Sequence, residues 1–259
     1  MIQSVRRAAA ILRELGSGHP RLGVTELSDR LSLAKATVYG LLRSLEADSL
    51  VERDHETGKY RLGPALLQLG NAYLEGHELR ARSLLWADSL ATRTLEAVRV
   101  AVPNGRSMLI VHHVFRPDNS VQMLEVGAAI PWHASALGKA VAAFRDEAAL
   151  KELLSDDQPL AQLTGRTIVE PDELRQALES VRRDGVAVED QEAVLGEAEV
   201  AAPVLDHDGH PIGAIGVAGP VEHLIPAGRA RDDVIAAVKQ SARGLSRDLG
   251  GVRRYARSR

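Results

Sequence analysis

The sequence predicts an α+β protein in which an N-terminal winged helix-turn-helix domain precedes a larger C-terminal domain with an antiparallel sheet. Three segments with helical apolar spacing, followed by two short extended segments, fill residues 1–63 in the order of a winged helix-turn-helix. In the rest of the 259-residue chain, apolar extended segments joined by short turns lie among helical segments, which is typical of α+β domains.

The first two predicted helices each begin at a capping residue. Ser4 can cap a helix that ends at Gly16 and carries apolar residues at helical spacing: Val5, Ala8, Ala9, Leu12 and Leu15. Thr25 can cap a second, short helix in which Leu27 and Leu31 lie one turn apart. Each helix therefore has one apolar face for a common core.

The third predicted helix, residues 35–47, follows the second after a turn of three residues, 32–34. Two short helices joined by so tight a turn form a helix-turn-helix. The apolar face of this helix carries Val38, Leu41, Leu42 and Leu45, and the opposite face carries Ala36, Tyr39, Gly40 and Arg43. Arg, Lys and Thr side chains suit contacts with guanine or phosphate. We therefore expect DNA contacts from four residues on or beside the outer face: Lys35, Thr37, Tyr39 and Arg43.

A predicted hairpin wing follows, in which the extended segments VERD and KYRLG flank the polar turn HETG. Lys59 and Arg61 share one face and are expected to contact phosphate, whereas Tyr60 and Leu62 share the other face and are expected to pack inward. The alternative is that these cations form an ordinary solvated surface. Residues 1–63 carry only 10 Lys and Arg against 8 Asp and Glu, so net charge alone does not decide.

A linker helix over residues 64–76 is predicted from Pro64, which suits a first helical turn, to Gly76, which interrupts the pattern. It precedes the second domain, residues 77–250. Helices are expected there over 77–96, 136–144, 146–154, 172–184 and 231–249, and extended segments over 98–103, 106–114, 120–126, 199–206 and 211–219. The dipeptide Asn104-Gly105 predicts a tight hairpin. Residues 251–259 are expected to be a flexible basic tail.

Composition argues against several other classes of protein. The chain has no Cys, which removes disulfides, thiolate metal sites and cysteine nucleophiles. No apolar run approaches the roughly 18 residues of a membrane span, so we expect a cytosolic protein with no membrane partner. The sequence shows no paired acid and base and no metal-ligand spacing. We therefore expect no catalytic residues, no metal and no cofactor.

Several segments carry a family resemblance over nearly the whole chain: QSVRRA, LAKATVYGLLRSLE, YRLG, HASALGKA and the block GVAVEDQEAVLGEAEVAAPVLDHDGHPIGAIGVAGP. In content and order they resemble the hallmarks of the IclR family of transcriptional regulators. The resemblance implies a winged helix-turn-helix, a linker helix that helps to pair the DNA-binding domains, and a GAF-like C-terminal effector domain. It also implies a homodimer or dimer of dimers on double-stranded operator DNA.

The resemblance further implies an effector site in which the backbone N–H groups of Ala136 and Leu137 hold the polar end of the ligand. Free N–H groups at a helix start attract anions and hydroxyl or carbonyl oxygens. Other family pocket positions correspond here to Ile130, Glu189, Glu199, Gly216 and Ala218. Glu199 stands where Cys or a small polar residue is common, and Gly216 and Ala218 replace hydroxyl side chains. Glu199 points either into the pocket or into solvent.

These positions hold two carboxylates and no Lys or Arg to balance an acid. Buried carboxylates repel an anion but accept hydrogen bonds from hydroxyls, so we expect glycerol or a related polyol as effector, with an organic acid as the alternative. The segments LGNAYLEGHELRARSL and VHHVFRPDNS are most similar to family members that control glycerol uptake and catabolism.

The sequence thus predicts a transcriptional repressor of a catabolic operon that responds to a small molecule. Regulation of another carbon-source pathway through a small organic acid is the main alternative. An enzyme with a DNA-binding appendage and a protein-interaction module are the weaker ones, because no catalytic constellation is present and an interaction module needs no enclosed loop such as HASALGKA.

Overall fold

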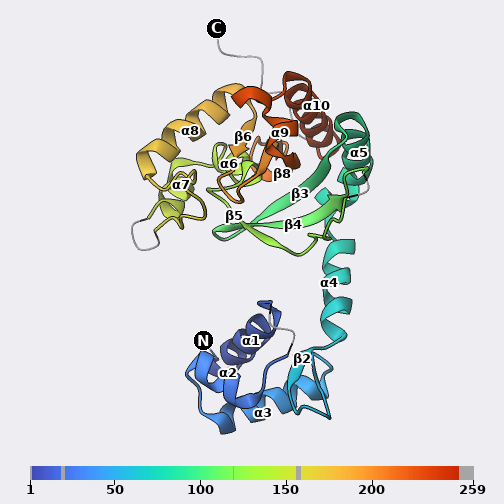
Figure 1. Ribbon diagram of the computed structural model, residues 1–259, viewed down its shortest axis with the longest axis vertical. Coiled ribbons are helices and arrows are strands. Elements are labelled where there is room, and N and C mark those ends of the chain that lie inside the picture. The colour runs from blue at the N-terminus through green and yellow to red at the C-terminus, as the bar shows by residue number, and fades with distance from the viewer. Residues whose placement is uncertain (1, 19–20, 119, 156–158, 251–259) are drawn as a thin grey trace. The chain divides into compact units, whose positions relative to one another are not determined.

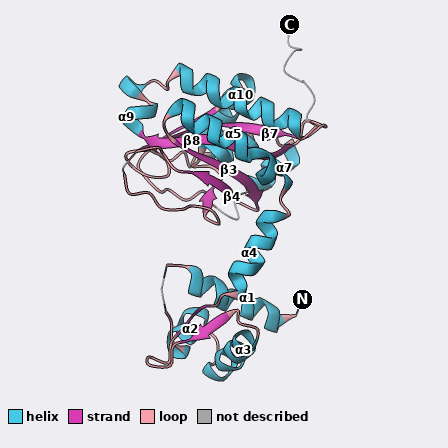
Figure 2. Cartoon of the chain, turned by 90° about the vertical axis from the view of Figure 1, so that its right-hand side faces the viewer, coloured by secondary structure: helices cyan, strands magenta, loops and turns pink. Residues whose placement is uncertain are grey.

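A computed structural model describes residues 2–18, 21–118, 120–155 and 159–250, so the predicted basic tail, 251–259, lies outside the described residues (Figure 1). The chain divides into two compact units, residues 1–76 and 77–259. The first consists of helices and a two-stranded sheet, and the second is built on a six-stranded sheet with helices packed against it (Figure 2). The predicted α+β class is confirmed.

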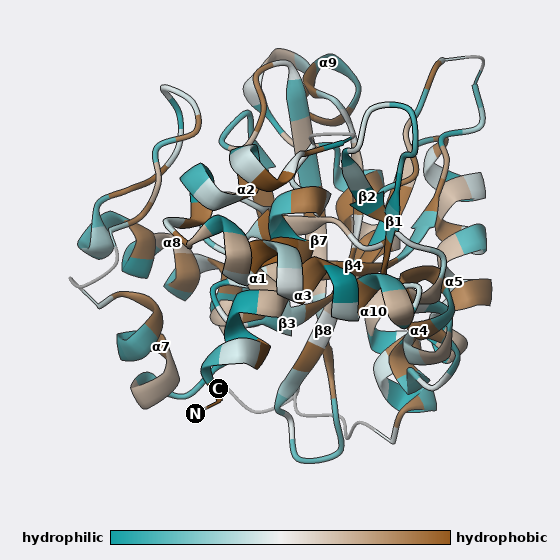
Figure 3. Cartoon of the chain, turned by 90° about the horizontal axis from the view of Figure 1, so that it is seen from below, coloured by the Kyte–Doolittle hydropathy of each residue, from teal (hydrophilic) through white to brown (hydrophobic). Residues whose placement is uncertain are grey.

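Three helices form the body of the first unit: α1 (Gln3–Gly16), α2 (Val24–Leu31) and α3 (Lys35–Ala47). Each carries hydrophobic and hydrophilic segments, as amphipathic helices around a core do (Figure 3). The core contains Ile11, Leu27, Val38 and Leu42, all fully buried. The turn between α2 and α3 begins at Ser32, whose φ of 52° places it in the left-handed region and redirects the chain.

The starts of α1 and α2 differ from the sequence prediction. Helix α1 begins at Gln3 after the N-cap Ile2, so Ser4 is not its cap. Helix α2 begins after the N-cap Gly23 rather than Thr25. The Glu26 carboxylate accepts the Gly23 N–H at 2.6 Å and so provides the hydrogen-bond partner of the N-cap N–H.

The wing is a hairpin of β1 (Val51–Arg53) and β2 (Tyr60–Leu62), in which Glu52 lies opposite Arg61. Helix α4 (Ala65–Glu75) follows, with Pro64 at its N-cap and Gly76 at its C-cap. It has no buried residue among those described, and Leu67, Leu69 and Tyr73 are all exposed.

The sheet of the second unit has the strand order β5-β4-β3-β8-β7-β6, and all neighbouring strands are antiparallel. Its strands are β3 (Ala97–Asn104), β4 (Ser107–Val114), β5 (Ala129–Pro131), β6 (Ala187–Asp190), β7 (Glu197–Leu205) and β8 (Pro211–Pro220). The expected hairpin at Asn104-Gly105 joins β3 to β4. The prediction of an extended segment over 120–126 is wrong, because the described part of this segment is a loop and the edge strand β5 begins at Ala129.

Helices cover both faces of this sheet. Helices α5 (Glu78–Thr94) and α10 (Asp232–Asp248) pack on each other and on β3, β7 and β8, and Gly213 of β8 lies against Leu79 of α5. The neighbouring Ala214 belongs to a core with α6 (Ala136–Ala142), α7 (Glu147–Leu153) and α8 (Pro171–Asp184). Because successive side chains of a strand point to opposite faces, the two helix groups lie on opposite sides. Two short segments, α9 (Val221–Leu224) and the 3-10 helix Pro226–Gly228, follow β8.

Candidate nucleic-acid interface and effector site

The outer face of α3 carries the residues that were expected to contact DNA. Lys35, Tyr39 and Arg43 are exposed and Thr37 is half-buried, while the other face of the helix buries Val38, Leu42 and Leu45 in the domain core. Ala36 and Gly40, also exposed, leave space between the longer side chains. Within the described ranges no carboxylate lies within ion-pair distance of Lys35 or Arg43. Both cations are therefore available for a polyanion.

The two cations of the wing, unlike Lys35 and Arg43 of α3, each lie close to a carboxylate. Lys59 lies 3.2 Å from the Glu26 carboxylate, and Arg61 lies 2.8 Å from that of Glu52 on the paired strand. All four side chains are well exposed, so these pairs contribute little to stability and can exchange for phosphate. The expectation that Tyr60 and Leu62 both pack inward is wrong for Leu62, which is 39% exposed, because β2 ends there and the sheet has only two strands.

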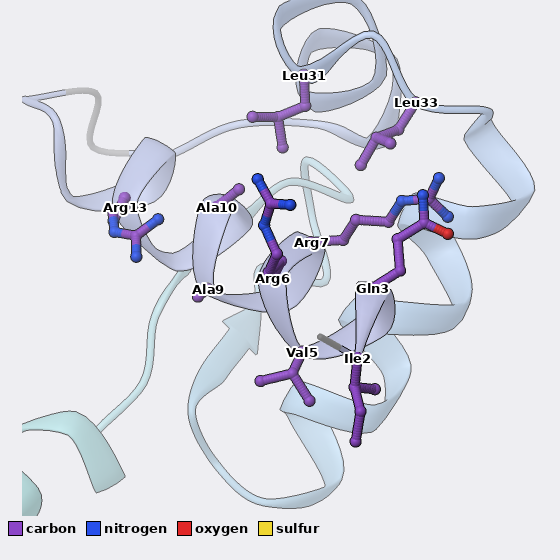
Figure 4. Close-up of a pocket in the computed structure, with 10 residues that line it drawn as sticks. All are labelled: Ile2, Gln3, Val5, Arg6, Arg7, Ala9, Ala10, Arg13, Leu31 and Leu33. Atoms are coloured by element: carbon purple, nitrogen blue, oxygen red, sulfur yellow. The ribbon is translucent and has the colours of Figure 1, made fainter.

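A recess of about 890 Å³ beside α1 has apolar residues in its lining, with Leu31 and Leu33 on one side of the helix and Ile2 and Val5 on the other (Figure 4). Three arginines of α1 lie along it: Arg6, Arg7 and Arg13. Sequence reasoning did not single them out. None pairs with a carboxylate among the residues that the structure describes, so they add to the positive surface of this domain.

In the second unit, the side chain of Glu199 points inward. It is 2% exposed, and its Oε2 accepts the N–H of Leu137 at 3.1 Å, in the first turn of α6. Its Oε1 lies 3.5 Å from Nη1 of Arg99 on β3. The sequence left open whether Glu199 points into the pocket or into solvent, and in the structure it points inward, toward the expected effector position. There it accepts the hydrogen bond of the Leu137 N–H, one of the two backbone donors expected to hold the effector.

Arg99 was not predicted, and it corrects the expectation that no cation lies beside these carboxylates. Its guanidinium donates to both oxygens of Glu125, with one N–O distance of 2.6 Å, and lies 4.0 Å from Glu197. Burial lowers the pKa of Arg99, but the carboxylates of Glu199 and Glu125 outweigh burial and hold that pKa above its usual value. Arg99 is thus shared by the carboxyl groups of Glu125, Glu197 and Glu199. This group of side chains contains more acids than cations, so Arg99 is not free to pair with an added anion.

Small residues make the approach of Arg99 to Glu199 possible. Strand β8 lies between β3 and β7, with Gly216 opposite Arg99 and Ala218 opposite Glu199. Gly216 and Ala218 lie two residues apart and so share a face of the sheet with the two charged residues. The ion pair therefore spans β8 diagonally, above two positions whose side chains are too short to separate the partners.

Glu189 of β6 lies directly opposite Glu199 of β7 and is 4% exposed. It accepts the N–H groups of Glu192 and Ala193, the latter at 3.1 Å. Burial, followed by the nearby Glu199 charge, raises the pKa of Glu189 to about 8. At neutral pH Glu189 is therefore mostly a neutral carboxylic acid, which can donate as well as accept a hydrogen bond.

The loop before α6 is held rigidly. Ser135 caps α6 by accepting the Gly138 N–H at 3.1 Å and donates to the Pro131 carbonyl at 2.7 Å. At Gly138 an added Cβ would overlap the carbonyl of Trp132, so the loop passes too close to the helix for any side chain. Lys139, 2% exposed, forms a buried ion pair with Glu192. The N–H groups of Ala136 and Leu137 are thus fixed in place.

The remaining effector candidates divide into two groups. Ala136, Leu137, Gly216 and Ala218 are buried in the same region as Glu189 and Glu199. Ile130 of β5 is half-buried and lines a groove of about 280 Å³ with Arg106, Trp132 and His133. Glu199 is not among the described residues that line this groove.

In the part of the chain that the structure describes, no group of three or more His, Asp or Glu side chains is placed to hold a metal ion. None of the helices described is both long and apolar enough to cross a membrane.

Comparison with known proteins extends over both units. Residues 4–55 match the IclR helix-turn-helix domain, and residues 71–247 match the bacterial transcriptional regulator IclR C-terminal domain. The glycerol operon regulatory proteins of Streptomyces coelicolor and Streptomyces griseus are 46% and 48% identical to the chain over 252 residues, 97% of this chain and 98% of each relative. An IclR transcriptional regulator from Alicyclobacillus acidocaldarius, 24% identical, has the same fold with a TM-score of 0.83, covering 97% of this chain and 100% of that one.

Proposed function

Because the chain belongs to the IclR family of transcriptional regulators, we propose that it represses a catabolic operon by binding the operator through α3 and the wing. The observation that carries the proposed mode of binding is the outer face of α3, where Lys35 and Arg43 are exposed and have no carboxylate partner among the described residues. Base contacts by Arg43 and Lys35 would supply sequence preference, and Lys59 and Arg61 of the wing would add phosphate contacts.

The regulated genes are proposed to be those of glycerol uptake and catabolism. Support comes from the two Streptomyces relatives, which are named as glycerol operon regulatory proteins and align with nearly the whole chain. The alternative is another carbon-source pathway. A regulator of either kind acts on DNA in the cytoplasm as a homodimer or dimer of dimers, in keeping with the exposed apolar residues of α4.

The effector is proposed to be a small neutral polyol, glycerol first and glycerol 3-phosphate second, bound near Ala136 and Leu137. The local charge supports a neutral molecule: Glu199 already holds the Leu137 N–H, and Arg99 is shared between Glu199 and Glu125. An added anion would be desolvated beside a carboxylate without a free cation to pair with. Hydroxyl groups can instead donate to Glu199 and exchange hydrogen bonds with Glu189.

The test combines operator binding with calorimetry on the full chain. DNA from upstream of the operon should be shifted specifically, and glycerol or glycerol 3-phosphate should both bind the protein and change that shift. Glyoxylate and pyruvate serve as acid probes. Tight binding of an acid, with no response to either glycerol compound, would contradict the polyol proposal, whereas turnover of any of these compounds would favour an enzyme.

A further inference from the structure

The carboxylate of Glu199 is held as a bound ligand would be. One oxygen accepts the Leu137 N–H at 3.1 Å, the other faces the Arg99 guanidinium at 3.5 Å, and the side chain is 2% exposed. A guanidinium and a main-chain N–H that converge on one carboxylate form a complete carboxylate-binding site. In this chain, the carboxylate that occupies the site is part of strand β7.

Three elements build this arrangement independently of one another. The Leu137 N–H is fixed by the packed loop before α6, since Gly138 allows no side chain against Trp132. Arg99 is fixed from the outside by Glu125. Gly216 and Ala218 keep the space between β3 and β7 free of longer side chains. The donors would therefore keep their positions if the Glu199 carboxylate were removed.

We propose that Glu199 is the residue that determines effector selectivity, by occupying the carboxylate-binding site of Arg99 and Leu137 and so excluding small carboxylic acids. The proposal rests on the proposed effector site and assigns its specificity. A carboxylate that its own strand holds in the right orientation has an effective concentration far above millimolar, so a free acid at millimolar concentration does not displace it. An acid that binds beside Glu199 finds the Leu137 N–H and the Arg99 guanidinium already engaged, in a buried place that does not solvate its charge.

Truncation of the side chain provides a direct test, since Glu199→Ala removes a group of the size and charge of acetate. In the full-length protein we expect acetate to bind Glu199→Ala more tightly than the parent by about tenfold or more, measured by calorimetry and by the shift in melting temperature. Acetamide, equal in size but neutral, should show no such gain. The gain should disappear in the double variant Arg99→Gln/Glu199→Ala.

A matched control is Glu197→Ala on the same strand. Glu197 also lies near Arg99, at 4.0 Å, but its side chain is 53% exposed and has no contact with Leu137. This variant removes the same charge without opening the buried site, and should gain no acetate affinity. An equal gain in Glu197→Ala, or none in a folded Glu199→Ala, would overturn the proposal.

If Glu199→Ala fails to give a cooperative melt by itself, acetate and not acetamide should restore one, because a ligand that binds only the folded state stabilises it. Failure of acetate to do so would also refute the proposal. The result is separable from that of the proposed function: absence of a glycerol response in the parent protein would refute the polyol effector and leave the acetate result standing.

Discussion

Glu189 and Glu199 face each other across strands β6 and β7, both buried, and lie on the same side of the sheet as α6. Two carboxylates in such a position cannot both be ionised without a large cost. Burial raises the pKa of Glu199, although Arg99 and the Leu137 N–H oppose this rise, and burial followed by the Glu199 charge raises the pKa of Glu189 to about 8. Glu189 is therefore mostly protonated at neutral pH.

This pair predicts a dependence of stability on pH. A carboxyl group whose pKa is raised by folding binds more protons in the folded than in the unfolded state, so its stabilising contribution is lost as pH rises through the folded pKa. For Glu189 the window lies between the usual carboxyl value, 4.5, and about 8. We expect Glu189→Gln to reduce the fall in unfolding free energy between pH 5 and pH 8 by roughly 1 to 4 kcal/mol, measured by urea denaturation.

Histidines with lowered pKa values, such as His112, His113 and His133, act in the opposite direction, since their stabilising contribution grows as pH rises. The comparison is therefore made between the parent and variant rather than within one protein. Glu147→Gln, at a side chain that is 78% exposed, provides the control. If Glu189→Gln and Glu147→Gln both parallel the parent curve, Glu189 is not protonated in the folded state.

The helix-turn-helix could be predicted from the sequence because its signals are local. Residues 35–47 form α3 as expected, since the spacing of Val38, Leu42 and Leu45 suits only a helix with one buried face. The wing hairpin followed in the same way from two short extended segments around a polar turn.

The charge arrangement of the effector domain could not be predicted in this way. Arg99 lies in the apolar run VRVAVP, 100 residues before Glu199, and only the strand order β3-β8-β7 brings the two together. Period-2 alternation indicates that Arg99 shares a face with Ala97 and Ala101, yet it does not show which strand lies beside it. Because the sequence does not show which strands are neighbours, it also left open whether the Glu199 side chain points into the pocket or into solvent.

Residues 120–126 show why apolar alternation can mislead. The segment looks like a strand, but Val121 is 99% exposed. Its neighbour Gln122 accepts the Arg116 N–H at 2.7 Å and donates to the Arg116 carbonyl at 2.9 Å. These side-chain bonds replace the ladder that a neighbouring strand would supply, so the chain forms a loop.

The exposed face of α3 predicts that Arg43→Ala and Lys35→Ala weaken operator binding without unfolding the domain. Loss of a base contact should cost about 1 to 3 kcal/mol and relax sequence preference, whereas loss of a phosphate contact should weaken binding to all sequences alike. Titrations with operator and unrelated DNA at matched salt separate the two. Arg82→Ala, at an exposed position of α5, is the control; parent-like operator affinity in both α3 variants would mean that another face reads the DNA.

The ion pair between Arg61 and Glu52 predicts opposite effects of two wing variants. Arg61→Ala should weaken binding to all DNA sequences and reduce the dependence on salt by about one phosphate contact. Glu52→Gln should strengthen binding to all DNA sequences, because it frees the Arg61 guanidinium and removes a charge that repels phosphate. Fluorescence anisotropy over a series of salt concentrations measures both. A parallel change in the two variants would show that the wing does not contact the backbone.

Gly138 and Gly70 predict contrasting effects of the same substitution. Gly138→Ala places a Cβ on the Trp132 carbonyl, so the loop before α6 must shift, at a cost of about 1 to 3 kcal/mol. Gly70→Ala, inside α4, meets no atom within 4 Å and should raise helix stability by up to about 1 kcal/mol. Thermal melting compares the two variants. A Gly138→Ala protein as stable as the parent would mean that the loop tolerates displacement, and the fixed position of the Leu137 N–H would then be in doubt.

The division of the chain after Gly76 predicts that residues 77–259 fold and bind effector without the winged domain. The six-stranded sheet is complete within this part, α5 and α10 pack on one face and α6 to α8 on the other, and Glu199, Arg99 and Leu137 all belong to it. Since both faces of the sheet are covered, the fragment should need no contact from residues 1–76 to bury its core. We expect a single cooperative melt that glycerol raises by the same amount as in the full chain. If the fragment aggregates or melts without cooperativity under conditions where the full chain is folded, the domain boundary lies elsewhere. A folded fragment without a glycerol response would leave the boundary intact and would contradict only the proposed effector.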